Sequence, residues 1–135
     1  MKTKLRKYMG MAALLMAVVM GLSSCEVEIF DDRHPSHVAL LEEYLCEPVW
    51  TDIWEEGYHL YEQRFIFYRN GQGREYFMDN GRECCYDFYW RWDRGDTRCI
   101  RMDYADGVSY LDDIVITRGV LRGYLNNEPV EFIAR

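Results

Sequence analysis

Hydrophobic and polar residues alternate in short runs along most of the chain from Val49 onward. In the run 85–92, Phe88 and Trp90 would share one face of a strand, and Asp87 would lie on the other. A period of two in such runs is typical of antiparallel strands with one buried face and one face in water. The pattern predicts eight strands, at residues 49–56, 61–69, 73–78, 85–92, 98–104, 108–117, 119–125 and 129–134.

The runs are separated by short segments rich in Gly, Asn and Asp. Asn70-Gly71 and Asn80-Gly81 are examples, and these residue types supply the positive φ angles of tight hairpins. No separator is long enough for a crossover helix, so each strand should pair with the next one along the chain. Eight strands in such a meander hide their edges by closing on themselves. The pattern therefore predicts an all-β, eight-stranded antiparallel up-and-down barrel.

One segment ahead of the strands has helical periodicity instead. Leu40, Leu41, Tyr44 and Leu45 recur at helical spacing within residues 36–46, and a proline follows soon after. We predict one short helix there. Because it directly precedes the first strand, it should plug the barrel end at which that strand begins.

The start of the chain differs in composition from the rest. Four basic residues precede a charge-free run of 14 residues at 9–22. A positive start followed by an apolar run of this length is typical of a secretory signal peptide. The run is too short to span a bilayer, which argues against a transmembrane anchor.

The apolar run leads into Leu22-Ser23-Ser24-Cys25. This tetrapeptide resembles the lipobox of bacterial lipoproteins, which implies acyl chains on Cys25 and a membrane anchor that is stable once two or more chains insert. The acidic segment that follows resembles an export signal of outer-membrane, surface-exposed lipoproteins; the alternative is a solvated linker. The sequence thus predicts a signal peptide at 1–24, a lipidated cysteine and tether at 25–35, and a barrel domain at 36–135.

The charge balance of the mature chain narrows the choice of partner. Of 16 basic residues, four precede Cys25, which leaves 12 against 23 acidic residues and a formal charge of −11 for residues 25–135. Phosphate backbones require a positive surface, so nucleic acid is excluded as a partner. A strongly negative surface would instead steer a basic protein toward the domain.

Several short motifs have the same order as in a known group of proteins. They are Trp50 in the first strand, Phe67-x-x-x-Gly71-x-Gly73 in the second hairpin, a Trp-rich fourth strand, and Leu121-x-Gly123 near the end. The order over residues 40–135 resembles the small lipocalin-like, calycin-type lipoproteins of Gram-negative bacteria. The resemblance implies a barrel of that architecture and a general capacity to bind a ligand.

Strand alternation directs a set of large side chains toward the barrel axis. These interior candidates are Phe65, Phe67, Tyr86, Phe88, Trp90, Trp92, Ile100, Met102, Tyr104 and Phe132. So many rings favour a filled interior, and the alternative is a shallow apolar pocket at the open end. At that end we expect Tyr58, His59 and Tyr61 to form the rim of a ligand site.

Four cysteines remain besides Cys25. If Trp90 pairs with Ile100 across the fourth hairpin, Cys99 lies near the hairpin tip, at the barrel end that also holds Cys46. A disulfide between Cys46 and Cys99 is then the pairing with the best geometry, and four unpaired thiols are the alternative.

No catalytic, metal-binding or cofactor-binding pattern is recognisable in the sequence. The cysteine spacing does not match zinc sites, and adjacent acids on a strand face opposite sides. We therefore expect no enzyme activity, metal or cofactor. The leading hypothesis is a lipid-anchored envelope protein whose barrel binds a small apolar or amphipathic ligand. The alternative is an acidic interaction or inhibitor protein that binds a basic partner such as a lysozyme.

Overall fold

The structure of the chain is a computed structural model that describes residues 35–135. The predicted signal peptide, Cys25 and nearly all of the tether lie outside the described residues. Within 35–135, no helix has the length and apolar character needed to cross a membrane.

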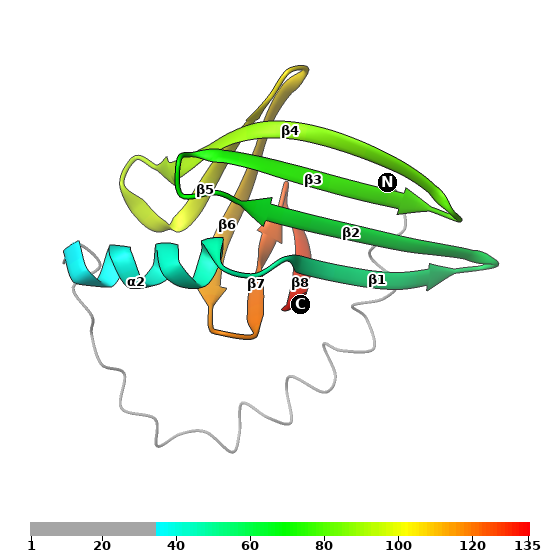
Figure 1. The fold of residues 1–135 in the computed structure, drawn as a ribbon, viewed down its shortest axis with the longest axis horizontal. Coiled ribbons are helices and arrows are strands. Elements are labelled where there is room, and N and C mark those ends of the chain that lie inside the picture. The colour runs from blue at the N-terminus through cyan, green and yellow to red at the C-terminus, as the bar shows by residue number, and fades with distance from the viewer. Residues whose placement is uncertain (1–34) are drawn as a thin grey trace, which may run out of the picture. The chain divides into compact units, whose positions relative to one another are not determined.

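The described chain holds one helix followed by eight strands (Figure 1). They are α2 (Pro35–Cys46), β1 (Trp50–Glu56), β2 (His59–Phe67), β3 (Gln72–Asp79), β4 (Arg82–Asp93), β5 (Asp96–Tyr104), β6 (Gly107–Ile116), β7 (Val120–Leu125) and β8 (Glu128–Ala134). Every predicted element is present, with ends within three residues of the predicted ones.

The strands form a closed antiparallel barrel in which each pairs with its neighbour in sequence and β1 pairs with β8. This confirms the predicted architecture. The closure is short: only Trp50 and Thr51 of β1 have partners on β8. The backbone amide of Val49 donates to the carbonyl of Arg135 (3.1 Å), and the amide of Arg135 donates in return (2.9 Å).

The first four strands continue beyond this closed section. Pairing between β4 and β5 begins at Phe88, so the first half of β4 has no partner on β5. Figure 1 shows the β1–β2 and β3–β4 hairpins reaching out together on one side of the molecule. We call this part, residues 52–63 and 76–86, the extension.

An apolar core fills the closed section. Its largest fully buried side chains are Trp50, Phe67, Phe132, Leu45, Ile100, Met102 and Leu121. Most neighbouring rings meet edge to face, with 5.3 Å between the centroids of Phe65 and Phe132 and 5.6 Å between those of Phe67 and Phe88. Such contacts add to the stabilisation that burial of the rings provides.

Most of the predicted interior residues lie in this core. The buried ones are Phe65, Phe67, Phe88, Trp90, Ile100, Met102 and Phe132, while Trp92 and Tyr104 are partly buried against it. Tyr86 is the exception, because its side chain is 49% exposed. Tyr86 lies on the same face of β4 as Phe88. It precedes the first residue pair between β4 and β5, so no strand of the closed section covers it.

Helix α2 closes the barrel end at which β1 begins, as predicted. Leu45 is fully buried in the core, and the indole Nε1 of Trp50 donates to the Leu45 carbonyl (2.9 Å). The Nε1 of Trp92 donates to Glu42 (3.2 Å). The rest of the predicted apolar stripe is less buried, and Leu40 is exposed.

The glycine motif in the second hairpin has a packing explanation. A Cβ atom on Gly73 would lie 2.2 Å from a ring carbon of Phe88, so only glycine fits beneath that ring. Gly71 has a φ of +83°, which glycine adopts without strain. The motif therefore supports the hairpin and the core beside it.

The predicted pairing between β4 and β5 is wrong by two residues. Ile100 pairs with Trp92, and Trp90 pairs with Met102. An irregularity between Trp92 and Asp93 adjusts the register near the hairpin tip. Because the error is an even number of residues, every side chain keeps its predicted face.

The predicted disulfide between Cys46 and Cys99 is not formed, since all four described cysteines are free thiols. The two side chains lie on different sides of the sheet. Cys46 packs against the core. Cys99 alternates with the buried Ile100 and therefore faces outward.

Candidate functional site

The inner face of the extension carries a second group of rings. Trp54 stacks on Tyr61, with 5.4 Å between ring centroids and 17° between ring planes. Phe77 lies 6.1 Å from Trp54. Tyr61 and Phe77 are only half-buried. These three rings lie on the core side of β1, β2 and β3 but outside the main core cluster.

A polar network lies between these rings and the core. The Nε2 of Gln63 donates to Oε1 of Glu75 (2.6 Å), and the hydroxyl of Tyr104 donates to Oε2 of the same carboxylate (2.8 Å). The residue Gln63 is 4% exposed. With one donor on each oxygen, the Glu75 carboxylate is fixed in orientation on the inner side of the barrel.

The tyrosine of this network remains a hydrogen-bond donor at all ordinary pH values. Burial raises the pKa of Tyr104 far above its usual value, and the nearby Glu75 charge raises it further. The phenol therefore keeps its proton, and its bond to Glu75 is not lost through titration of Tyr104.

The predicted rim residues divide into two groups. Tyr61 belongs to the ring cluster, and His59 borders it, with 6.0 Å between the two ring centroids. The Nδ1 of His59 also lies 3.3 Å from Oδ1 of Asp79. Tyr58 is fully exposed at the β1–β2 turn.

Sequence reasoning missed Trp54, Gln63, Glu75 and Phe77 as site residues. A signal was present, because β3 places Gly73, Glu75 and Phe77 on one face. Because Glu75 shares the inward face with Gly73 and Phe77, its carboxylate needs polar partners inside the barrel. The partners on β2 and β5 could be found only once the register was known.

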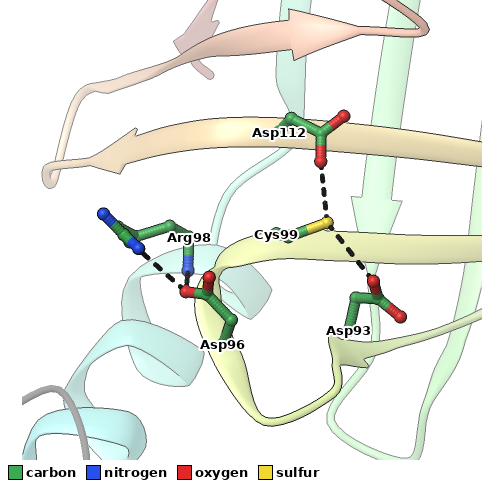
Figure 2. A network of polar contacts seen from close by, with 5 residues as sticks. All are labelled: Asp93, Asp96, Arg98, Cys99 and Asp112. Atoms are coloured by element: carbon green, nitrogen blue, oxygen red, sulfur yellow. Dashed lines mark hydrogen bonds and ion pairs between the residues drawn. The ribbon is translucent and has the colours of Figure 1, made fainter.

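A second polar cluster lies on the outer face of β4, β5 and β6 (Figure 2). The thiol of Cys99 donates to Oδ1 of Asp112 (2.9 Å) and lies 4.0 Å from Oδ2 of Asp93. The Nε of Arg98 lies 3.4 Å from Asp96. Figure 2 shows the Arg98 guanidinium directed away from the thiol.

Burial and the acidic side chains around Cys99 make its thiol a weak nucleophile. Burial and the Asp112 carboxylate raise the pKa of its thiol to about 12, and the thiolate is the reactive form. The cluster therefore favours a structural role over covalent catalysis. Among residues 35–135, no group of three His, Cys, Asp or Glu side chains could hold a metal ion.

Comparison of the chain with models of known families, with curated proteins and with solved structures finds no match.

Proposed function

We propose that this protein is a lipid-anchored cell-envelope protein whose barrel binds a small amphipathic ligand at its open end. The apolar part of the ligand would pack on Trp54, Tyr61 and Phe77, and its polar end would reach the Glu75 network. The observation that carries the proposal is the position of the Gln63–Glu75–Tyr104 network directly beside half-buried aromatic rings.

This combination suits an amphipathic ligand better than a purely apolar one. Ligand sites in barrels combine apolar walls with a few polar groups that fix orientation. A hydrocarbon alone would remove water from the Glu75 carboxylate without replacing its hydrogen bonds, at a cost in free energy. A head group that donates hydrogen bonds avoids that cost.

The binding test uses the full chain anchored in phospholipid vesicles, with empty vesicles as the blank. A brominated alkylamine and a brominated fatty acid of equal length serve as probes, because bromine quenches tryptophan fluorescence. We expect quenching that is lost in Trp54→Phe, and an affinity reduced about tenfold in Tyr61→Ala.

Tyr124→Ala is the matched control, since it removes an exposed tyrosine from β7. Binding should be unchanged in this variant. Equal affinity of the Tyr61→Ala and Tyr124→Ala variants would refute the site, and failure of both probes to quench would refute the function.

The anchor is tested separately by cell fractionation. Cys25→Ala should move the protein from the membrane fraction to the soluble fraction, because the acyl chains supply the membrane affinity. Retention of Cys25→Ala in the membrane fraction would contradict lipidation. Proteolysis of intact cells should remove the domain if it is displayed on the surface.

A basic protein partner is the second candidate function. It is favoured by the carboxylates of Asp93, Asp96 and Asp112, which lie close together around Cys99 (Figure 2). Association of this kind weakens steeply with salt. Capture of lysozyme that disappears at high ionic strength would support it, and salt-independent behaviour would count against it.

A further inference from the structure

A groove crosses the outer face of β3, β4 and β5, on the opposite side of the sheet from the core. Its volume is about 570 Å³, and its lining includes Tyr68, Gln72, Arg74, Asp87, Tyr89 and Asp103. The register places Gln72, Tyr89 and Asp103 in one row across the three strands. Alternation directs the side chains of this row away from the open-end site. Among the residues of that site, the groove borders Tyr104 alone, which lines the groove and also belongs to the Glu75 network.

Two tyrosines present their rings at this groove. Tyr89 is 64% exposed and Tyr68 is 43% exposed. Among the described residues, neither ring takes part in the aromatic contacts of the core or the extension. The backbone of Tyr68 is fixed, because its amide donates to Gln72 and its carbonyl accepts from Nε1 of Trp90, both at 2.8 Å.

Planar polar groups lie beside the tyrosines and are already ordered. The Nε of Arg74 donates to Oδ1 of Asp87 (2.7 Å), and Nδ2 of Asn70 donates to Oε1 of Gln72 (3.2 Å). The guanidinium, carboxylate and amide each have capacity for further hydrogen bonds. Flat groups of this kind can bind two neighbouring hydroxyls at once.

The charges of the groove cancel. Arg74 is balanced by Asp87, and Asp103 is balanced by Arg101 at 2.9 Å. The domain as a whole is strongly negative, so a polyanion would be repelled, and a basic ligand would find stronger attraction at unbalanced acids elsewhere. A neutral ligand rich in hydroxyl groups fits the groove best.

We propose that this groove binds a neutral oligosaccharide. The C–H face of a sugar ring would stack on Tyr89, because an aromatic face carries negative charge that attracts polarised C–H bonds. The sugar hydroxyls would bond to Gln72, Arg74 and Asp87. The groove volume lies within the range of ligand sites, roughly 300–1,000 Å³.

The test uses the full chain in phospholipid vesicles, because common detergents carry sugar head groups. Maltohexaose, cellohexaose, laminarihexaose and chitohexaose are titrated by saturation-transfer NMR up to about 10 mM, which detects dissociation constants in the millimolar range. We expect at least one to bind, with an affinity that does not change with salt. Tyr89→Ala should weaken it about tenfold, and Tyr89→Phe should largely preserve it.

Tyr124→Ala is again the control, since it removes another exposed tyrosine, from β7. Thermal melting confirms that each variant is folded. The proposal is overturned if none of the four sugars binds, if Tyr89→Ala binds as well as the unmodified chain, or if acidic polygalacturonate binds in preference to the neutral sugars. Tyr89 lies outside the open-end site, so its substitution tests the groove separately from that site.

Discussion

The closed section of the barrel and its extension use aromatic residues in different ways. In the closed section most neighbouring rings meet edge to face and are buried, as Phe65 and Phe132 are, although Phe65 also stacks on Phe67. In the extension Trp54 and Tyr61 stack nearly parallel, and Tyr61 remains half-buried beside the Glu75 network. The first arrangement fills space, whereas the second leaves ring surface and hydrogen-bonding groups within reach of a ligand.

This difference follows from how the sheet closes. Trp50 and Thr51 are the positions at which β1 pairs with β8, so the later residues of β1 lie beyond the closure. An interior enclosed by strands all round favours well-packed apolar residues, whereas a partly exposed inner face tolerates polar ones. We therefore expect stability to depend on the closed section and ligand binding on the extension.

The largest predicted difference between the two parts comes from ring truncation. Phe132→Ala should lower the free energy of unfolding by about 4 kcal/mol, because it leaves a cavity in the core. Tyr61→Ala should cost about 1 kcal/mol, since part of its ring is already in water. Urea unfolding of both variants measures the two values. Equal losses of unfolding free energy would contradict the assignment of stability to the closed section.

A second, smaller effect concerns the glycine beneath Phe88. Gly73→Ala should cost about 2 kcal/mol through overpacking. Gly107→Ala is the control, because no atom lies within 4 Å of the added Cβ, and it should change stability by less than about 0.5 kcal/mol. Phe88→Leu should restore part of the loss in Gly73→Ala; additive losses in the double variant would rule out a direct clash.

The sequence was sufficient to predict the fold because period-two alternation and turn residues agree along the whole domain. Each strand has its own alternation, and each turn has its own Gly, Asn or Asp. The helix position followed from its spacing and from the proline after it. Local signals of this kind need no knowledge of contacts distant in sequence.

The candidate site could not be predicted in the same way because it depends on register and on where the closure ends. Glu75 meets Tyr104 across 29 positions in sequence, and no local pattern encodes that contact. The exposure of Tyr86 likewise depends on the point at which β4 and β5 stop pairing. The two-residue error at Ile100 shows how alternation fixes a face but leaves the register open.

A single hydrogen bond on the inner side of the barrel should contribute more to stability than one on the outer face. Tyr104→Phe removes one donor from the partly buried Glu75 carboxylate and should cost about 1 kcal/mol. Tyr110→Phe is the control, since the Tyr110 hydroxyl accepts a weaker bond from Arg101 (3.3 Å) on the outer face. Unfolding free energies measure both, and a larger loss for Tyr110→Phe would argue against the importance of the inner network.

The mildest test leaves the fold unchanged and measures thiol reactivity. Cys84 and Cys85 are exposed on β4, at the extension. At the other end of the barrel, burial raises the pKa of Cys46 to about 11, and burial with Asp112 raises that of Cys99 to about 12.

Only the thiolate reacts with an alkylating reagent, so a raised pKa slows labelling at neutral pH. After full reduction, alkylation at pH 8 should be slower in the folded protein than in urea, by roughly a hundredfold for Cys46 and roughly a thousandfold for Cys99. Both rates should then rise about tenfold for each unit of pH up to about pH 10, as the thiolate fraction grows. Peptide mass analysis at timed points gives each rate. If Cys99 reacted in the folded protein as quickly as Cys85, the Asp112 hydrogen bond would not protect it, and this outer face would be as open as the extension.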